Sequence, residues 1–194
     1  AVAPVQSANF GAAVATDGNT LIIGAYNDSR QGAAFIFNKQ DGQWQQRRKV
    51  TANGTSYYGH SVAVDGSTAV IAAKEERNGQ AEQEGALYIF ENTNDAWSQT
   101  QRLVTLNGVG RVYLGDSVAI DEDVIVAGAS EDEQFGRSAG AAFVYHRVDG
   151  QWQQVTKLTA SDAERDYNFG RSVAIHGNFI AVGAPYANQN QGAV

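Results

Sequence analysis

A unit of roughly 50 residues recurs along this chain of 194 residues, and no other feature restricts its fold as strongly. Each copy opens with a bulky residue and a glycine, and a pair of small residues follows at a constant interval. The opening pairs are Phe10-Gly11, Tyr58-Gly59, Leu114-Gly115 and Phe169-Gly170. The small pairs are Gly24-Ala25, Ala72-Ala73, Gly128-Ala129 and Gly183-Ala184. Repetition of this kind indicates a repeat architecture in which each copy is one supersecondary unit.

Within one copy the pattern predicts four short β-strands. The third copy shows this most clearly, because its apolar or alternating stretches have strand length and are rich in β-branched residues. These stretches are 117–120, 124–127, 141–145 and 152–158. Asp149-Gly150 suits a two-residue hairpin turn, since this dipeptide adopts positive φ at low cost. A β-sandwich with coincidental spacing is the alternative, which four matching copies disfavour.

Four antiparallel strands per copy are typical of a propeller blade, so we expect an all-β fold, a β-propeller with three complete blades and a partial fourth. The chain is expected to form one domain, or part of one, over 1–194. Its repeats are expected at about 10–57, 58–113, 114–168 and 169–194.

The fourth copy breaks at Gly192-Ala193-Val194, inside its expected third strand. Part of a longer propeller is the interpretation that this break favours. Two alternatives stay open: a four-bladed ring in which residues 1–6 pair with the last blade, and association of chains through an unpaired strand edge.

Two kinds of connection differ in length between copies, whereas the other intervals are constant. They are the loop between the second and third strands (the 2–3 loop) and the segment that leads from the fourth strand to the next copy (the 4–1 connection). In an up-and-down blade both leave at the same end, which we call the loop end. Variable loops on a constant scaffold usually carry binding specificity, so the loop end is the predicted binding face.

The residues Phe169-Gly170, Ser172-Val173-Ala174 and Gly183-Ala184-Pro185 resemble the FG-GAP repeat. This repeat builds the propeller of integrin α subunits and of many bacterial surface or secreted proteins. The segment 152–169 is similar to the bacterial branch of the family. The resemblance implies a β-propeller that serves binding or adhesion outside the cell or in the periplasm and is usually not an enzyme.

In integrin-type repeats a calcium-binding loop lies between the first two strands. Here that position carries Asp17-Gly18, Asp65-Gly66, 121–123 and His176-Gly177. These turns are too short to supply the roughly six to eight oxygen ligands that calcium takes, so no cofactor is expected, and calcium has only weak support. The weak candidates for a metal site are the loop acids Glu131, Asp132, Glu133, Asp162, Glu164 and Asp166. Such acidic runs more often only keep a loop solvated.

Candidate ligand-binding residues gather at the loop end. His60, Asp116 and Arg171 follow an opening glycine. Because the first strand of a blade lines the propeller axis, they are expected around the channel mouth. Tyrosine and arginine recur at interaction hot spots. The full candidate set is Tyr26, His60, Arg111, Tyr113, Asp116, Tyr167, Arg171 and Tyr186. Substituting Tyr113 or Arg111 is expected to impair partner binding without unfolding the chain. The opening aromatic residues and the tryptophans repeat at constant spacing, which favours scaffold roles for them.

Composition narrows the choice of partner. The net charge of −7 disfavours nucleic acid, and no apolar stretch approaches the roughly 18 residues that membrane insertion needs. Cysteine is absent, which leaves the redox compartment open. No nucleophile elbow or phosphate loop marks an enzyme. We therefore expect a non-enzymatic module, extracellular, on the cell surface or periplasmic, whose loop end binds a protein. A glycan-binding propeller and a self-associating structural unit are the alternatives.

Overall fold

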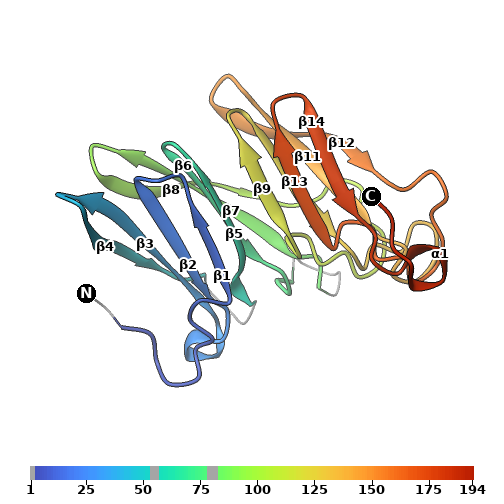
Figure 1. Ribbon diagram of the computed structural model, residues 1–194, viewed down its shortest axis with the longest axis horizontal. Coiled ribbons are helices and arrows are strands. Elements are labelled where there is room, and N and C mark those ends of the chain that lie inside the picture. The colour runs from blue at the N-terminus through green and yellow to red at the C-terminus, as the bar shows by residue number, and fades with distance from the viewer. Residues whose placement is uncertain (1–2, 53–56, 78–82) are drawn as a thin grey trace.

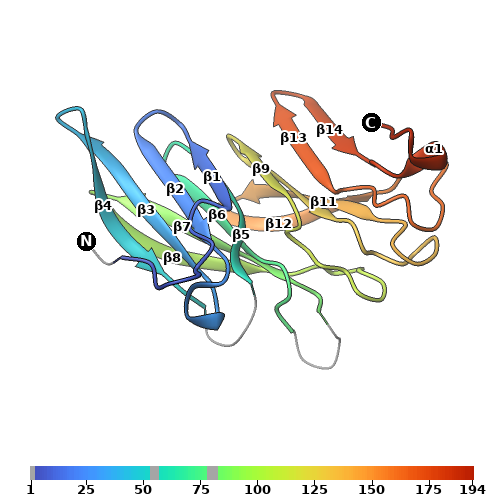
Figure 2. The same cartoon turned by 60° about the horizontal axis from the view of Figure 1, so that its bottom comes forward.

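A computed structural model of the chain describes residues 3–52, 57–77 and 83–194. It contains three antiparallel sheets of four strands and one sheet of two strands, and the strands of every sheet follow chain order. Figures 1 and 2 show the sheets side by side as blades of an open arc, with the first and the fourth at opposite ends. The predicted all-β propeller, with three complete blades and a partial fourth, is confirmed.

In each complete blade the second strand has six residues and the third and fourth have eight, whereas the first strand has four, eight and four residues in the first, second and third blades. The first blade contains β1 (Ala13–Thr16), β2 (Thr20–Ala25), β3 (Ala33–Gln40) and β4 (Gln43–Val50). The second contains β5 (Tyr58–Asp65), β6 (Thr68–Ala73), β7 (Ala86–Thr93) and β8 (Ala96–Leu103). The third contains β9 (Val118–Asp121), β10 (Val124–Ala129), β11 (Ala141–Val148) and β12 (Gln151–Leu158). The repeat in sequence is therefore a repeat in structure.

The fourth blade contains β13 (Ser172–His176) and β14 (Phe179–Gly183). A bridge between Ala184 and Ala193 follows β14. The same pairing of two alanines starts the third strand in each complete blade. Residue 193 therefore occupies the position at which a third strand begins, as the sequence predicts. Two short helical segments, η1 (Asp28–Arg30) and α1 (Ala187–Asn190), lie in 2–3 loops.

The hydrophobic core lies between neighbouring blades, because alternate residues of each strand face the preceding and the following blade. Two of the opening residues, Tyr58 and Leu114, are fully buried in these layers, and Trp97 and Trp152 are almost fully buried there. This burial agrees with the predicted scaffold role. Their first-blade counterparts have no preceding blade against them in this structure: Phe10 is 44% exposed and Trp44 is 42% exposed.

Glycines allow the backbones of adjacent blades to touch. Gly24 of β2 lies against the carbonyl oxygen of Gly59, and Gly128 of β10 lies against that of Gly170. A Cβ atom at either position would fall far inside contact distance of that oxygen. Gly59 and Gly170 have φ angles of 81° and 92°, which favour glycine. The opening glycine of one blade and the small pair of the blade before it are thus two halves of one contact.

Aspartates at the turn between the first two strands link the blades at the end opposite the loops. Asp65 accepts a hydrogen bond from the backbone N–H of Glu122 in the next blade at 2.7 Å. Asp121 accepts one in the same way from Gly177 at 2.5 Å. The positions that correspond to the integrin calcium loop therefore carry links between neighbouring hairpins.

The 2–3 loops and the 4–1 connections lie together at one end of the arc. In Figure 1 this is the lower end, which carries η1 and α1, whereas the hairpin turns lie at the upper end. In the described residues the two kinds of variable connection thus share one end, as the sequence predicts.

Candidate functional site

A group of polar side chains gathers at the loop end where the second, third and fourth blades meet. We call it the Asp116 cluster. Its members are His60, Lys74, Asp116, Ser130 and Arg171. They occupy two repeat positions, the residue after an opening glycine and the residue after a small pair. Since the first two strands of a blade pair antiparallel, these two positions lie side by side at the loop end.

The carboxylate of Asp116 is the centre of the cluster. Its Oδ1 accepts a hydrogen bond from Lys74 Nζ at 2.6 Å and lies 3.3 Å from His60 Nε2. Its Oδ2 accepts hydrogen bonds from Ser130 Oγ at 2.5 Å and from Arg171 Nη1 at 2.7 Å. The Asp116 side chain is 1% exposed, whereas that of Arg171 is 51% exposed. Asp116 is therefore buried under its own partners.

The electrostatics of the cluster follow from this arrangement. Burial alone would raise the pKa of Asp116, but the hydrogen bonds from His60, Lys74 and Ser130 outweigh burial and hold that pKa well below its ordinary value. The hydrogen bond and the charge of Asp116 raise the pKa of Arg171 in turn. Asp116 is thus an ionised anchor for two cations, Lys74 and Arg171.

Tyrosines surround the charged centre. The rings of Tyr26 and Tyr57 stack with centroids 5.4 Å apart and an interplanar angle of 11°. Tyr26 also contacts the His60 ring at 5.8 Å. Lys74 Nζ lies 5.4 Å from the centroid of the Tyr113 ring, within cation–π range. The loop end therefore joins aromatic and cationic groups in one surface.

Most of the predicted ligand-binding residues come together here. Tyr26, His60, Tyr113, Asp116 and Arg171 belong to this one surface.

Three predicted residues lie outside those contacts. Tyr186 is near enough to Arg171 to influence its pKa and is 53% exposed. Arg111 is exposed on a 4–1 connection. Tyr167 lines a separate pocket, described below.

Sequence reasoning missed Lys74 and Ser130. Both follow a small pair, at the position that Tyr26 and Pro185 hold in the other copies. Comparing the residues after the small pairs with the residues after the opening glycines would have found them. Residues at these two repeat positions contact each other across a blade junction, because Tyr26 contacts His60 and Lys74 contacts Asp116 of the following blade.

The six acids weighed as metal ligands do not form one group. Asp132 is fully buried, and both of its oxygens lie 2.9 Å from Lys157 Nζ. Asp166 pairs with Arg137 and Arg165. Glu131 accepts a hydrogen bond from the hydroxyl group of Ser138. Among the residues that the structure describes, no group of three or more histidine, aspartate or glutamate side chains could hold a metal ion.

Asp132 instead belongs to an ion pair that each complete blade repeats. The acid lies in the 2–3 loop and the cation on the fourth strand. The pairs are Asp28–Lys49 at 2.8 Å, Glu76–Arg102 at 2.6 Å and Asp132–Lys157 at 2.9 Å. The backbone N–H groups of Val5 and Val109 also donate to Asp28 and Asp132. Each of these acids links a 2–3 loop to the fourth strand of its own blade. The fourth blade has Ala187 at the position of the acid.

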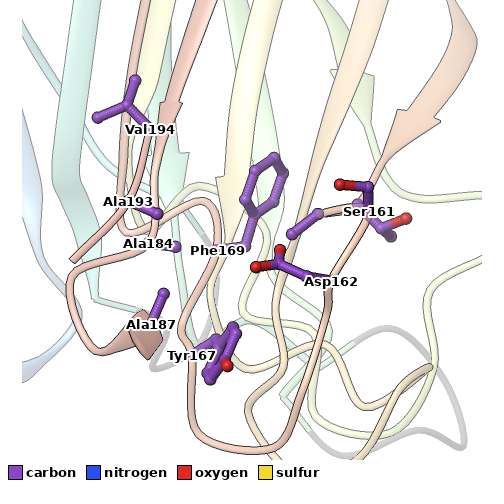
Figure 3. Close-up of a pocket in the computed structure, with 10 residues that line it drawn as sticks. Ser161, Asp162, Tyr167, Phe169, Ala184, Ala187, Ala193 and Val194 are labelled. Atoms are coloured by element: carbon purple, nitrogen blue, oxygen red, sulfur yellow. The ribbon is translucent and has the colours of Figure 1, made fainter. Parts of the chain in front are cut away.

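A pocket of about 260 Å³ lies between the third blade and the partial fourth blade. Figure 3 shows Phe169 in its centre, with Ala184, Ala187 and Ala193 of the fourth blade and Asp162 of the 4–1 connection around it. Tyr167 lines the same pocket. The lining is mixed, because Thr159, Ser161 and Asp162 bring polar groups to it and Phe169 and the alanines bring apolar ones.

Comparison with known proteins places the repeats. The described residues include no helix of the length and hydropathy needed to cross a membrane. A comparison with curated proteins found no match. The family model of the FG-GAP repeat matches residues 4–37, 44–90, 97–145 and 152–194. The last three matches begin at Trp44, Trp97 and Trp152 on the fourth strand, so this unit is offset by one strand from one counted from the opening glycine.

FG-GAP repeats occur in propeller domains that serve adhesion and binding, and they are typical of extracellular and secreted proteins. The family is typically non-catalytic. The four matches cover nearly the whole chain, and each contains the first two strands of one blade. The chain therefore belongs to the FG-GAP repeat family.

Proposed function

We propose that this chain is a non-enzymatic, extracellular adhesion module, similar in use to the integrin head, that binds a protein partner through its loop end. The observation that carries the proposal is the surface around the Asp116 cluster, where the half-exposed Arg171 pairs with a buried carboxylate and tyrosine rings lie against His60 and Lys74. Tyrosine and arginine are enriched among the residues that dominate binding energy at protein interfaces.

The exposed groups of this surface are held in place before a partner arrives. Arg171 donates to Asp116 through Nη1 alone, which leaves other N–H groups of its guanidinium for a ligand. Tyr57, 44% exposed, is stacked on Tyr26. Side chains that are already ordered lose less conformational entropy on binding, so their contacts contribute more to affinity.

Two features favour a protein partner over a glycan. The Tyr26 and Tyr57 rings stack on each other, which occupies one face of each ring. The contacts at the loop end also differ from blade to blade, whereas a propeller lectin is expected to present the same sugar-binding set once per blade. The surface is one asymmetric patch, as suits a single protein epitope.

Substitution at this surface is expected to weaken partner binding at least about tenfold without unfolding the chain, the size of loss typical of a hot-spot residue. Arg171→Ala and Tyr57→Ala each remove one exposed group. Phe179→Ser, at the hairpin end of the fourth blade and 83% exposed, is the control. The measurement is biolayer interferometry against a panel of purified extracellular matrix and cell-surface proteins, with circular dichroism to verify folding.

Binding that Phe179→Ser weakens, and that Arg171→Ala and Tyr57→Ala leave unchanged, would contradict this location of the site. Saturable hits on a glycan array with none on the protein panel would favour the lectin alternative. Self-association of the unliganded chain in sedimentation velocity, with no hit on either panel, would favour the structural unit.

A further inference from the structure

A polar groove lies at the hairpin end of the molecule, where the first and second blades meet. Its volume is about 510 Å³. Both blades beside it have all four strands, and Figure 1 shows their hairpin turns at the upper end, opposite the loop end. Four asparagines, two aspartates, a threonine, a serine and a glycine line the groove. The described residues in its wall thus bring carboxylate, amide and hydroxyl groups and no cationic side chain.

The next junction along the chain, between the second and third blades, shows which chemical group belongs at this place. Asn92 and Arg147 occupy the same repeat position, because each pairs with the tryptophan of its own fourth strand. Their backbone N–H groups also donate to equivalent carbonyl oxygens, those of residues 67 and 123. The two junctions can therefore be compared residue by residue.

Arg147 extends across its junction from the third blade to the second. Its Nη2 donates a hydrogen bond to Thr68 Oγ1 at 2.8 Å and pairs with the carboxylate of Glu91. Asp123, whose Oδ1 lies 3.7 Å from Arg147 Nε, adds a second carboxylate. At this junction, a hydroxyl group and two carboxylates therefore hold a guanidinium group between the blades.

The groove between the first and second blades has equivalent acceptors without the guanidinium group. Thr20 pairs with Asn38 between β2 and β3. Thr68 pairs with Glu91 in the same way between β6 and β7, so the two pairs of acceptors hold equivalent places. At the remaining position asparagine stands in place of arginine, and its shorter side chain leaves the groove open.

The groove also has the negative charge that a guanidinium group needs. Asp17 and Asp95 both line it. Asp17 Oδ1 accepts hydrogen bonds from the backbone N–H groups of residues 19 and 20 at 2.9 and 2.7 Å, which fixes this carboxylate before a ligand arrives. Asn38 Oδ1 accepts a hydrogen bond from Trp97 Nε1 at 3.0 Å. An amide oxygen has two lone pairs, so Asn38 can accept a second hydrogen bond.

We infer that this groove binds the guanidinium group of an arginine ligand, at the end of the molecule opposite the surface of the proposed function. The guanidinium group takes the place that Arg147 has in the next junction. Thr20 and Asn38 accept its hydrogen bonds, and Asp17 and Asp95 balance its charge. A planar guanidinium group with five N–H donors can bridge several acceptors at once, which favours it over an ammonium group. The net charge of −7 also favours a cationic ligand.

The probe is N-acetyl-arginine methylamide, and the readout is the backbone amide shifts of the isotope-labelled full chain in nuclear magnetic resonance. Saturable shifts are expected at Ser67 and Asn92, which line the groove. N-acetyl-citrulline methylamide has an uncharged urea group of the same shape and is expected to bind about tenfold more weakly, because it loses the charge-assisted hydrogen bonds.

Free arginine is the second arm of the titration. Tighter binding of the capped probe would assign the groove to an arginine side chain of a peptide, and tighter binding of free arginine would assign it to the amino acid itself. Both results support a guanidinium site.

Two pairs of variants test the groove. Asp95→Asn is expected to weaken binding of the capped probe about two- to fivefold, the size of effect of an exposed ion pair. Asp41→Asn makes the same change at the equivalent turn of the first blade, outside the groove, and is expected to leave binding unchanged. Asn92→Arg supplies the guanidinium group from the chain itself and is expected to abolish probe binding, whereas Asn92→Gln is expected to retain it.

The reverse substitution tests the comparison of the two junctions. Arg147→Asn is expected to open the groove between the second and third blades and to add saturable shifts at Glu122 and Asp123. Arg171→Ala at the loop end is expected to leave probe binding unchanged, so this inference and the proposed function can fail independently.

Three results would overturn the inference. They are the absence of saturable shifts in the groove, equal binding of the arginine and citrulline probes, and probe binding that Asn92→Arg leaves unchanged. Tighter binding of calcium or of a neutral sugar than of the arginine probe, at the same amides, would assign the groove to another ligand and would also count against it.

Discussion

Gly128→Ala is expected to destabilise the fold by about 3 kcal/mol, the upper part of the range for overpacked sites. For a chain of this size such a change corresponds to a fall in Tm of roughly 6–12 °C. The reason is steric: the added Cβ would fall on the backbone carbonyl of Gly170 in the next blade. Backbone cannot rotate away as a side chain can, so β10 and the opening turn of the fourth blade must separate.

The chain provides a matched control for this substitution. Gly183 holds the same repeat position in the fourth blade, and neither it nor Gly128 has a positive φ. A Cβ on Gly183 would meet chiefly the hydroxyl oxygen of Ser172, which can rotate away. Gly183→Ala is therefore expected to change stability by less than about 1 kcal/mol. Both variants are compared by urea unfolding followed by circular dichroism.

Equal stability of the two alanine variants would show that the blades yield at this contact. The second copy shows what the junction looks like where alanine replaces this glycine. Its small pair is Ala72-Ala73, and there a Cβ on the facing Gly115 would meet the Cβ of Ala72 at 2.5 Å in place of a carbonyl oxygen. Alanine is accommodated at this repeat position where the junction between blades has a different geometry. The loss of stability in Gly128→Ala therefore reports the close backbone contact at the junction and not strand propensity.

The fold could be predicted almost completely because its determinants are local and repeated. The Asp-Gly turns, the apolar runs and the fixed intervals lie within single copies, and four copies remove most of the ambiguity of one. The contacts that the glycines make between blades could not be predicted in this way. The contact of Gly24 with Gly59 joins two blades, and sequence spacing alone gives no distance between them.

The candidate site could be predicted only in part, because contacts between blades cannot be derived from sequence spacing. His60, Asp116 and Arg171 occupy the same repeat position, which comparison of the copies reveals. The depth of Asp116, and its contact with Lys74 from the preceding blade, depend on packing between blades. The acids of the 2–3 loops were ambiguous because a buried ion pair and a solvated loop look alike in sequence; for Asp132 the partner is Lys157.

Asp116→Asn is expected to lower the free energy of unfolding at pH 7 by about 3 kcal/mol, the lower limit for removing one partner of a buried ion pair. The substitution leaves Lys74 and Arg171 facing each other without the carboxylate between them. The loss stays at the lower limit because Arg171 is half exposed and can turn into water. Urea unfolding at pH 7 measures the difference.

The same substitution is expected to change how stability depends on pH. The pKa of Asp116 lies below its ordinary value of 3.8 in the folded chain, so the unfolded chain takes up the proton first as the pH falls. The stabilisation from this carboxylate is complete well above pH 4 and is lost progressively as the pH falls from about 4 towards the lower, folded pKa. The difference between the parent chain and Asp116→Asn should therefore shrink between pH 5 and pH 3 or so.

Asp149→Asn is the matched control, since it removes the same charge from an exposed hairpin turn of the same blade. It is expected to change stability by less than about 0.5 kcal/mol at every pH. A stability difference for Asp116→Asn that stays constant from pH 7 to pH 3 would contradict an ionised Asp116 in the folded chain. A purely steric role of this side chain would not depend on its protonation. A shrinking difference, found for Asp116→Asn and absent in Asp149→Asn, would assign the effect to the buried carboxylate that anchors Arg171 at the loop end.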